Sequence, residues 1–309
     1  MSAIEENMNN RVPEDEIDLR QLFSVIWKGK ILVISITTLV ALGSIFYALS
    51  LSNYFSSESV LVSRSSQDSS PLSQFSGLAA MGGIDLAGNS NNSTFTIMEI
   101  IQSREFVKHL ITFENVLPSI IAAQHYDPGT QKLSFDPEMY DIKTKTWIRE
   151  QSPNQSVEPT YLEVHRAYLE MLSIGQDRLT GFINIKIEHI SPVFAKEFLE
   201  LVIKEANNLN REIDIDKSSK ALSYLKIELS QTSNFEMINS ISRLIEGQLE
   251  TRMMASIHEE YSLITLEPPF IPDKRSRPTR SLIVIFSTLI GGLIGIAWVL
   301  VRHFTSGKE

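Results

Sequence analysis

EPPFIPDKRSRPTR (267–280), followed after Ser281 by LIVIFSTLIGGLIGIAWVLV (282–301), decides how the rest of this sequence is interpreted. Proline fixes φ and lacks a backbone N–H donor, so the first segment cannot form a regular helix or an inner strand. We predict an extended, semi-rigid strut over 267–280. The second segment is uncharged and, as a helix, is long enough to cross a hydrocarbon core of about 30 Å. A stiff strut that leads into a membrane span predicts a domain held in a fixed pose on a membrane.

A second apolar block, Ile31–Leu51, also carries no charge. The alternative is a signal peptide, whose apolar region is roughly 7–15 residues and ends at a small-residue cleavage site. This block is longer and has no such site, so we interpret it as a retained span. Lys28 and Lys30 precede it, and the next basic residue is Arg64. The positive-inside rule then places both termini in the cytoplasm and the residues between the spans in the periplasm.

The predicted spans divide the chain into five parts. Residues 1–30 form a cytoplasmic tail that ends in a short amphipathic helix, Ile17–Trp27; this helix lies at the membrane interface or is a solvated lead-in to the span. The remaining parts are a first transmembrane helix, a periplasmic domain that ends in the strut, a second transmembrane helix and a cytoplasmic tail, at residues 31–51, 52–280, 281–301 and 302–309.

The first half of the middle domain has weaker patterns. A strand is predicted over Tyr54–Val62, and the Ser-, Gly- and Asn-rich residues Ser65–Asn92 predict a flexible loop. Helices are predicted over Thr96–Thr112 and Thr160–Leu172. Between them, Phe113–Pro159 is broken by Pro118, Pro128, Pro137 and Pro153 and is predicted to be irregular.

The second half is more regular. Isoleucine alternates with polar residues in FINIKIEHI (182–190), which predicts a strand with one buried face. Ser191-Pro192 supplies an N-cap and a first-turn proline for a helix that runs to about Thr232. Its apolar stripe weakens between Glu205 and Lys220, which predicts a bend or a solvent-exposed stretch there. A second helix follows from Phe235, with Ile241, Ile245 and Leu249 in its apolar stripe.

A last strand, Tyr261–Leu266, should pair with the first strand, because the two adjoin the two spans. The predicted fold is therefore an α+β membrane protein. Two transmembrane helices flank a periplasmic domain that has a membrane-proximal α/β base and a long helical-hairpin arm.

Composition and motifs exclude most chemistries. The net charge of −9 and pI near 5.3 argue against nucleic-acid binding, and the absence of cysteine excludes disulfides and thiolate sites. The sequence has no HExxH, GxSxG, Walker or dinucleotide motif. Neither the six histidines nor the carboxylate pairs Glu259–Glu260 and Asp214–Asp216 show metal or catalytic spacing. The histidines are His109, His125, His165, His189, His258 and His303. We expect no catalytic residues, no cofactor and no metal, and hence no enzyme.

Three glycines lie in the second span. Gly291 and Gly295 form a GxxxG pattern, with Gly292 beside it. In a membrane such spacing lets helices approach closely, and we predict packing against the first span or a neighbouring subunit. The alternative is that glycine is simply common in transmembrane helices.

Both ends of the sequence resemble one known family. IDLRQLFSVIWKGK (17–30), with YFSSESVLV (54–62) after the span, resembles the opening domain of chain-length-determinant (Wzz-type) polysaccharide co-polymerases. YSLITLEPPFIPDKRSRP (261–278) resembles the proline-rich segment that precedes their second span. Arg275 stands where many members carry another proline. The strut positions that we single out are Pro268, Pro269, Pro272, Lys274 and Pro278.

The resemblance implies an inner-membrane protein whose periplasmic domains assemble into a ring. Its implied partners are further copies of this chain, a membrane-embedded polysaccharide polymerase, the lipid bilayer and the nascent polysaccharide. The implied function is control of the chain length of lipopolysaccharide O-antigen or exopolysaccharide. Two alternatives stay open: an adaptor for exopolysaccharide export or a kinase, and a two-span periplasmic sensor.

Overall fold

The computed structural model describes residues 25, 27–64, 88–150 and 156–306. The chain divides into two compact units. One comprises Met1–Ser52 and Arg277–Glu309, and the other is Asn53–Ser276. Most of the predicted amphipathic helix at 17–27 and most of the predicted loop at 65–92 lie outside the described residues.

The first unit consists of two long apolar helices that pack against each other, α2 (Lys30–Ser50) and α11 (Arg280–Ser306). Lys30–Ser50 and Arg280–His303 are strongly apolar and are both long enough to cross a membrane. Only 11% and 17% of these segments are buried, so most of their apolar surface faces outward. This differs from the core helix of a soluble protein and suits a lipid environment. The predicted spans fall on these two helices.

A four-stranded antiparallel sheet forms the base of the second unit. Its strands are β1 (Phe55–Ser63), β6 (Leu172–Gln176), β7 (Ile183–His189) and β8 (Leu263–Glu267), in the order β6-β7-β1-β8. Leu61 of β1 lies opposite Thr265 of β8, so the predicted pairing of the first and last strands is confirmed. β6 was not predicted. β6 begins directly after the helix that ends at Met171. Because no turn residues separate them, the change from helical to strand spacing of apolar residues at Leu172 was not recognised.

Helices pack on the isoleucine face of β7. Ile183, Ile185 and Ile187 are fully buried, as their alternation predicted. The helices in contact with this core are α5 (Gly88–Gln102), α6 (Arg104–Leu110), α7 (Val116–Ile121), α8 (Tyr161–Met171) and α9 (Pro192–Gln231). Tyr168 of α8 is fully buried, and its hydroxyl donates to the carbonyl of Ile101 in α5 at 3.1 Å.

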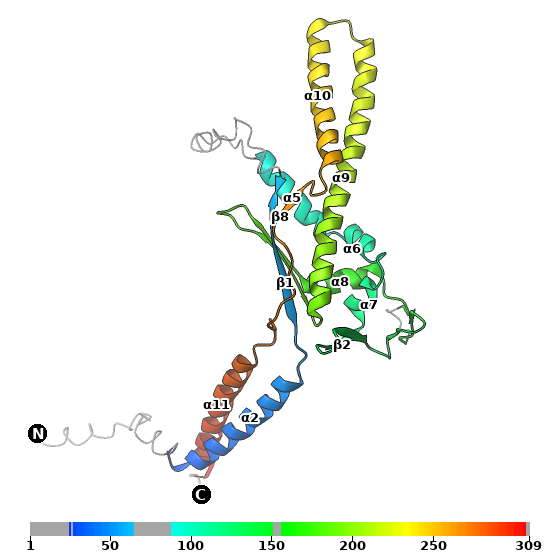
Figure 1. Cartoon of the computed structure of the whole chain (residues 1–309). Helices are drawn as coiled ribbons and strands as arrows, with labels where there is room; N and C mark the ends of the chain where they lie inside the picture. The colour runs from blue at the N-terminus through cyan, green and yellow to red at the C-terminus, as the bar shows by residue number, and fades with distance from the viewer. Residues whose placement is uncertain (1–24, 26, 65–87, 151–155, 307–309) are drawn as a thin grey trace, which may run out of the picture. The chain divides into compact units, whose positions relative to one another are not determined.

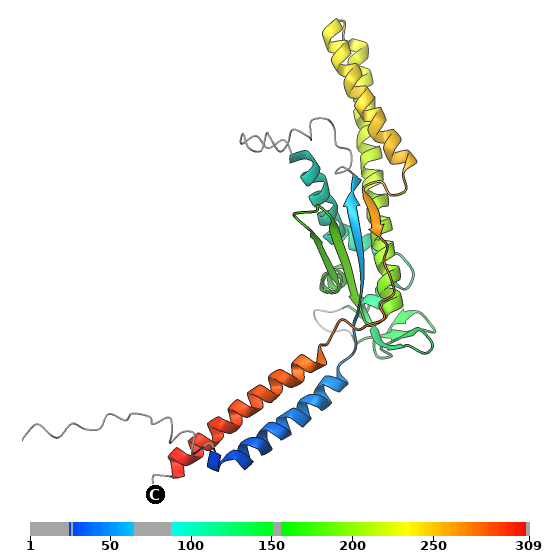
Figure 2. The ribbon, with the colours of Figure 1, turned by 60° about the vertical axis from the view of Figure 1, so that its left-hand side comes forward.

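The helix α9 begins as predicted and is the longest element. The Ser191 hydroxyl accepts from Phe194 N at 3.2 Å, and Pro192 is the first helical residue. Forty residues correspond to about 60 Å. The helix α10 (Phe235–Ile257) returns alongside the C-terminal half of α9, as Figures 1 and 2 show.

The structure bears on two predictions about these helices, and only the second, the exposed stretch of α9, is wrong. Ile241 of α10 is buried, but Leu249 is 51% exposed, so the predicted apolar stripe is only partly covered within one chain. The stretch of α9 between Glu205 and Lys220 is not a solvent-exposed interruption. Glu205, Asn207 and Ser218 are buried there, because polar partners on neighbouring elements bind the first two of them.

The prediction of one helix over 96–112 was wrong. The chain forms α5 and α6, which meet at Ser103, and the Ser103 hydroxyl caps α6 by accepting from Phe106 N at 3.1 Å. Residues 88–92, which were assigned to the flexible loop, belong to the first turns of α5. A serine cap inside a continuous apolar pattern is a weak signal, and this explains the error.

Residues 113–159 are also more regular than predicted. They contain α7 (Val116–Ile121) and two hairpins, β2 (Ala123–Asp127) with β3 (Lys132–Phe135) and β4 (Tyr140–Asp141) with β5 (Thr146–Trp147). An aspartate stabilises each hairpin turn: Asp127 accepts from Gly129 N at 3.0 Å and Asp141 from Lys143 N at 2.9 Å. We call β2–β5 the hairpin lobe.

Candidate functional site

The strut follows β8 but does not continue the backbone hydrogen bonds that β8 makes with β1. Pro268 and Pro269 have no N–H to donate, so side chains of β1 take over the pairing. Ser59 Oγ donates to the carbonyl of Glu267 at 2.7 Å, and Ser57 Oγ donates to the carbonyl of Phe270 at 2.8 Å. Both serines are buried. The strut is thus fastened to the sheet by two buried hydroxyls that the sequence interpretation missed.

The strut positions singled out from sequence lie in different environments. Pro269 and Pro272 are buried, Pro278 is half-buried, and Pro268 and Lys274 are exposed. The chain bends at Asp273 and Lys274, so the strut is not uniformly straight. The strut role of these five residues stays a prediction.

The two ends of the second unit are tied together. Ser276 N donates to the carbonyl of Tyr54 at 2.7 Å, and Ser276 Oγ donates to Glu188 Oε1 of β7 at 2.6 Å. Ser50 ends α2 four residues before Tyr54, and Arg280 begins α11 four residues after Ser276. Both apolar helices therefore leave the domain from one place, each within about 14 Å of chain.

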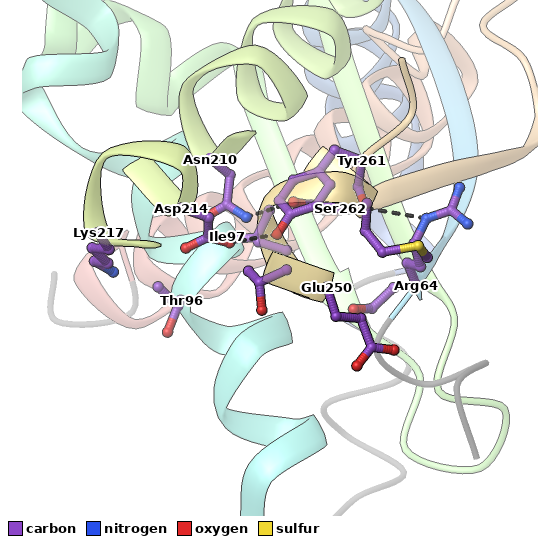
Figure 3. Close-up of a pocket in the computed structure, with 12 residues that line it drawn as sticks. Arg64, Thr96, Ile97, Asn210, Asp214, Lys217, Glu250, Tyr261 and Ser262 are labelled. Carbon is purple, nitrogen blue, oxygen red and sulfur yellow. Dashed lines mark hydrogen bonds between the residues drawn. The ribbon is translucent and has the colours of Figure 1, made fainter. Parts of the chain in front are cut away.

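A cluster of polar side chains joins β1 and β8 to α9, and we call it the polar joint (Figure 3). Tyr261 Oη donates to Asp214 Oδ2 at 2.9 Å, and Asn210 Nδ2 donates to Ser262 Oγ at 2.5 Å. Arg64 donates to the carbonyl of Glu260 at 2.9 Å. Burial and the Asp214 carboxylate raise the pKa of Tyr261, so its hydroxyl stays protonated and remains a donor.

Asn207 is the buried centre of the polar joint and is 3% exposed. Its Oδ1 accepts from Ser262 N and Leu263 N, both at 2.8 Å, and its Nδ2 donates to the carbonyl of Leu263 at 3.0 Å. One side chain of α9 therefore satisfies the backbone where β8 begins. These hydrogen bonds fix α9 against the sheet. They thereby also fix the position at which the helical arm begins.

A cavity of about 470 Å³ lies beside the polar joint, between α5, α9 and α10. Its lining includes Thr96, Lys217, Glu250 and Tyr261 (Figure 3). Within the part of the chain that the structure describes, no three His, Cys, Asp or Glu residues lie close enough together to hold a metal ion. The cavity brings together charges of both signs, but its described lining contains no histidine or cysteine that could act as a base or nucleophile.

The glycines of α11 lie against α2. A Cβ on Gly291 would be 2.9 Å from Val40 Cβ, and a Cβ on Gly295 would be 3.1 Å from Val33 Cα. Such distances require the neighbouring atoms to shift. A Cβ on Gly292 would lie 3.8 Å from Thr37 Oγ1, which is ordinary contact. The geometry is the one that small residues permit between membrane helices, and the packing role stays a proposal.

Several of the histidines and paired carboxylates have hydrogen-bond or ion-pair partners within the domain. His109 Nε2 lies 2.7 Å from Glu205 Oε2, and His165 Nε2 lies 2.8 Å from the carbonyl of Gln102. Asp214 belongs to the polar joint, and Asp216 pairs with Lys220 at 2.7 Å on the surface of α9.

His189 provides a pH-dependent prediction. Its Nε2 lies 2.9 Å from the carbonyl of Ser119, its Nδ1 accepts from Ser191 N at 3.1 Å, and burial lowers its pKa from 6.5 to about 4. Between these values the unfolded chain binds more protons than the folded chain. Stability should therefore fall as the pH drops from 6.5 towards 4, by up to about 3 kcal/mol, and be fully present at neutral pH.

We expect His189→Gln to flatten this slope in urea unfolding curves that are recorded at several pH values. The exposed His125 provides the matched control, since His125→Gln should leave the slope unchanged. An equal slope in the parent protein and in His189→Gln would contradict the assignment.

The chain thus has two candidate membrane spans, one before and one after an α+β domain whose two ends are hydrogen-bonded to each other. The chain length determinant protein (Wzz) family model matches residues 15–113, which include α2, β1, α5 and α6. Residues 15–113 are thus similar to the Wzz-type family, as 17–30 and 54–62 predicted; the proline-rich residues 261–278 lie outside the match.

One solved structure that aligns with the chain is described as a "full-length bacterial polysaccharide co-polymerase". The identity is 14% and the TM-score is 0.40, with 94% of this chain and 99% of that chain covered. No curated protein sequence matches the chain.

Proposed function

We propose that this chain regulates the length of a surface polysaccharide, either O-antigen or exopolysaccharide, without itself catalysing a reaction. The observation that carries the proposal is the match of residues 15–113 to the chain length determinant family. The pairing of β1, inside that match, with β8, outside it, supports extending the proposal to the domain as a whole.

In this proposal the protein lies in the bacterial inner membrane, with both termini cytoplasmic and Asn53–Ser276 periplasmic. Lys28 and Lys30, at the start of α2, support this orientation through the positive-inside rule. The strut and the paired ends at Tyr54 and Ser276 support a domain that is held close to the bilayer. α2 and α11 would present their outer surfaces to lipid and to a membrane-embedded polymerase.

The mechanism that we propose is positional. Helices α9 and α10 would form a periplasmic arm, and several arms in a ring would set how long the polymerase retains its nascent polysaccharide. Large apolar side chains support a homo-oligomer, because α9 and α10 expose several that one chain leaves uncovered. They are Tyr224, Ile227, Phe235, Met237, Leu244, Leu249, Met253 and Ile257.

Two other functions remain alternatives. An adaptor for exopolysaccharide export or for a kinase would share the same membrane anchoring, and a two-span sensor would use the cavity beside the polar joint as a ligand site. The sensor would also require a cytoplasmic output element.

The test is the size distribution of the surface polysaccharide, measured on a gel with and without this gene. We expect removal to replace a defined modal length by a broad spread, and the intact gene to restore the mode. Loss of all exported polymer would favour the adaptor. An unchanged distribution would reject length control and leave the sensor.

A further inference from the structure

The hairpin lobe packs at the end of the domain where the apolar helices leave. Phe55 begins β1, and its ring packs edge-to-face on Tyr126 of β2 with the centroids 6.5 Å apart. A hollow of about 330 Å³ is lined both by Tyr140 and Ile142 of the lobe and by Ser191 and Phe194 at the start of α9. Figures 1 and 2 both show β2 and its neighbours at this end of the sheet.

Chain length limits how far this end of the domain can lie from the two apolar helices. Tyr54 is four residues from the end of α2, and Ser276 is four residues from the start of α11. If α2 and α11 span the membrane, both residues lie within about 14 Å of a span end. The lobe therefore lies at the end of the domain to which both spans are attached.

The lobe presents apolar side chains on a rigid framework. Trp147 packs on Tyr140 with the ring centroids 5.1 Å apart, and Tyr140 packs on Phe135 at 5.6 Å. In the β4–β5 turn, Asp141 accepts from Lys143 N and from Thr144 Oγ1, both at 2.9 Å. Ile142 in this turn is 58% exposed.

We infer that the hairpin lobe is a docking surface for the lipid bilayer, with the Ile142–Lys143 turn as its contact. An isoleucine beside an exposed lysine suits the boundary between acyl chains and headgroup phosphates. The half-buried Trp147 behind the turn is of an aromatic type favoured at that boundary. Such a contact would add a third attachment to the two spans and restrict tilting of the domain.

The sequence supplies a matched control in the β6–β7 turn. Leu179 is 97% exposed there, and Asp177 accepts from Leu179 N at 2.7 Å, much as Asp141 stabilises its own turn. Phe55 pairs with His189 at one end of β7, whereas Leu179 adjoins Ile183 at the other end. The seven residues of β7 separate the two ends by about 20 Å.

The chain has no cysteine, so single-cysteine variants can carry one fluorescent label. We would label Ile142→Cys and Leu179→Cys with the environment-sensitive dye NBD and reconstitute the full chain in phosphatidylethanolamine–phosphatidylglycerol vesicles. Some vesicles would contain lipid with a nitroxide near the headgroup. We expect the nitroxide to quench the label at 142 about threefold more than the label at 179.

Equal, weak quenching at both positions would overturn the inference. A label at 142 that is shielded from aqueous iodide but not quenched by the lipid nitroxide would also overturn it, and would assign this face to a second copy of the chain. The vesicles contain no polysaccharide, so this result is independent of the proposed length control, although it does require α2 and α11 to be inserted.

Discussion

Asn207→Ala is expected to destabilise the protein by about 4 kcal/mol, because it leaves two buried N–H donors and one buried carbonyl without their partner. Those groups belong to Ser262 and Leu263, where β8 begins. The free energy of unfolding would be measured by urea denaturation of the full chain in detergent. Amide hydrogen exchange should also become faster at Ser262 and Leu263, since their bonds end on the deleted side chain.

The neighbouring residue Asn208 provides the control. Its Nδ2 donates to Glu205 Oε1 at 3.0 Å, and its Oδ1 accepts from Arg211, but the structure gives it no bond to β8. Asn208 is half-buried, so Asn208→Ala should cost about 1 kcal/mol. Similar losses for the two variants would show that Asn207 does not have the special role assigned to it.

Replacing both Gly291 and Gly295 by leucine is expected to separate α2 from α11. Added Cβ atoms at these positions would lie 2.9 Å from Val40 Cβ and 3.1 Å from Val33 Cα, and the second of these is a backbone atom. Overpacking typically costs about 1–3 kcal/mol per site, so the double variant should lose about 4 kcal/mol of helix association.

A cross-link between the helices measures this separation. Thr37→Cys and Gly292→Cys place the two thiols in neighbouring positions, since a Cβ on Gly292 would lie 3.8 Å from Thr37 Oγ1, and the chain has no other cysteine. We expect oxidative cross-linking in membranes to fall by about tenfold or more in the double leucine variant. Gly43→Leu is the control, since a Cβ on Gly43 meets no atom within 4 Å. Undiminished cross-linking in the double variant would contradict intrachain packing through these glycines.

The spacing of apolar residues predicted an element correctly where one face of that element is uniformly buried. The alternation of Ile183, Ile185 and Ile187 predicted β7 correctly, and Ser191-Pro192 located the start of α9. It failed where local polar contacts decide the structure. The cap at Ser103 divided a predicted helix, and Asp127 and Asp141 organised hairpins in a segment predicted to be irregular.

The polar joint and the strut contacts were harder to predict for a different reason. Ser57 and Ser59 bind carbonyls more than 200 residues away along the chain, and Asn207 binds backbone about 55 residues away. A single sequence does not reveal which distant backbone groups lack partners. The one available signal was the weakened apolar stripe of α9 after Glu205, which marks buried polar residues rather than an exposed stretch.

We propose that the arm of α9 and α10 acts as a spacer in length control, and shortening the arm tests this proposal directly. Deleting residues 225–231 and 235–241 removes about two turns, or roughly 10 Å, from each helix while retaining the turn at 232–234 and nearly the same helical phase. Lys226→Ala, at an exposed position within the deleted stretch, is the length-preserving control.

The measurement is the modal length of surface polysaccharide on a gel, for variants with parental expression and parental oligomeric state. The spacer account predicts a narrow distribution at a shorter modal length for the deletion, and the parental distribution for Lys226→Ala. A deletion variant that retains the parental modal length would contradict the account.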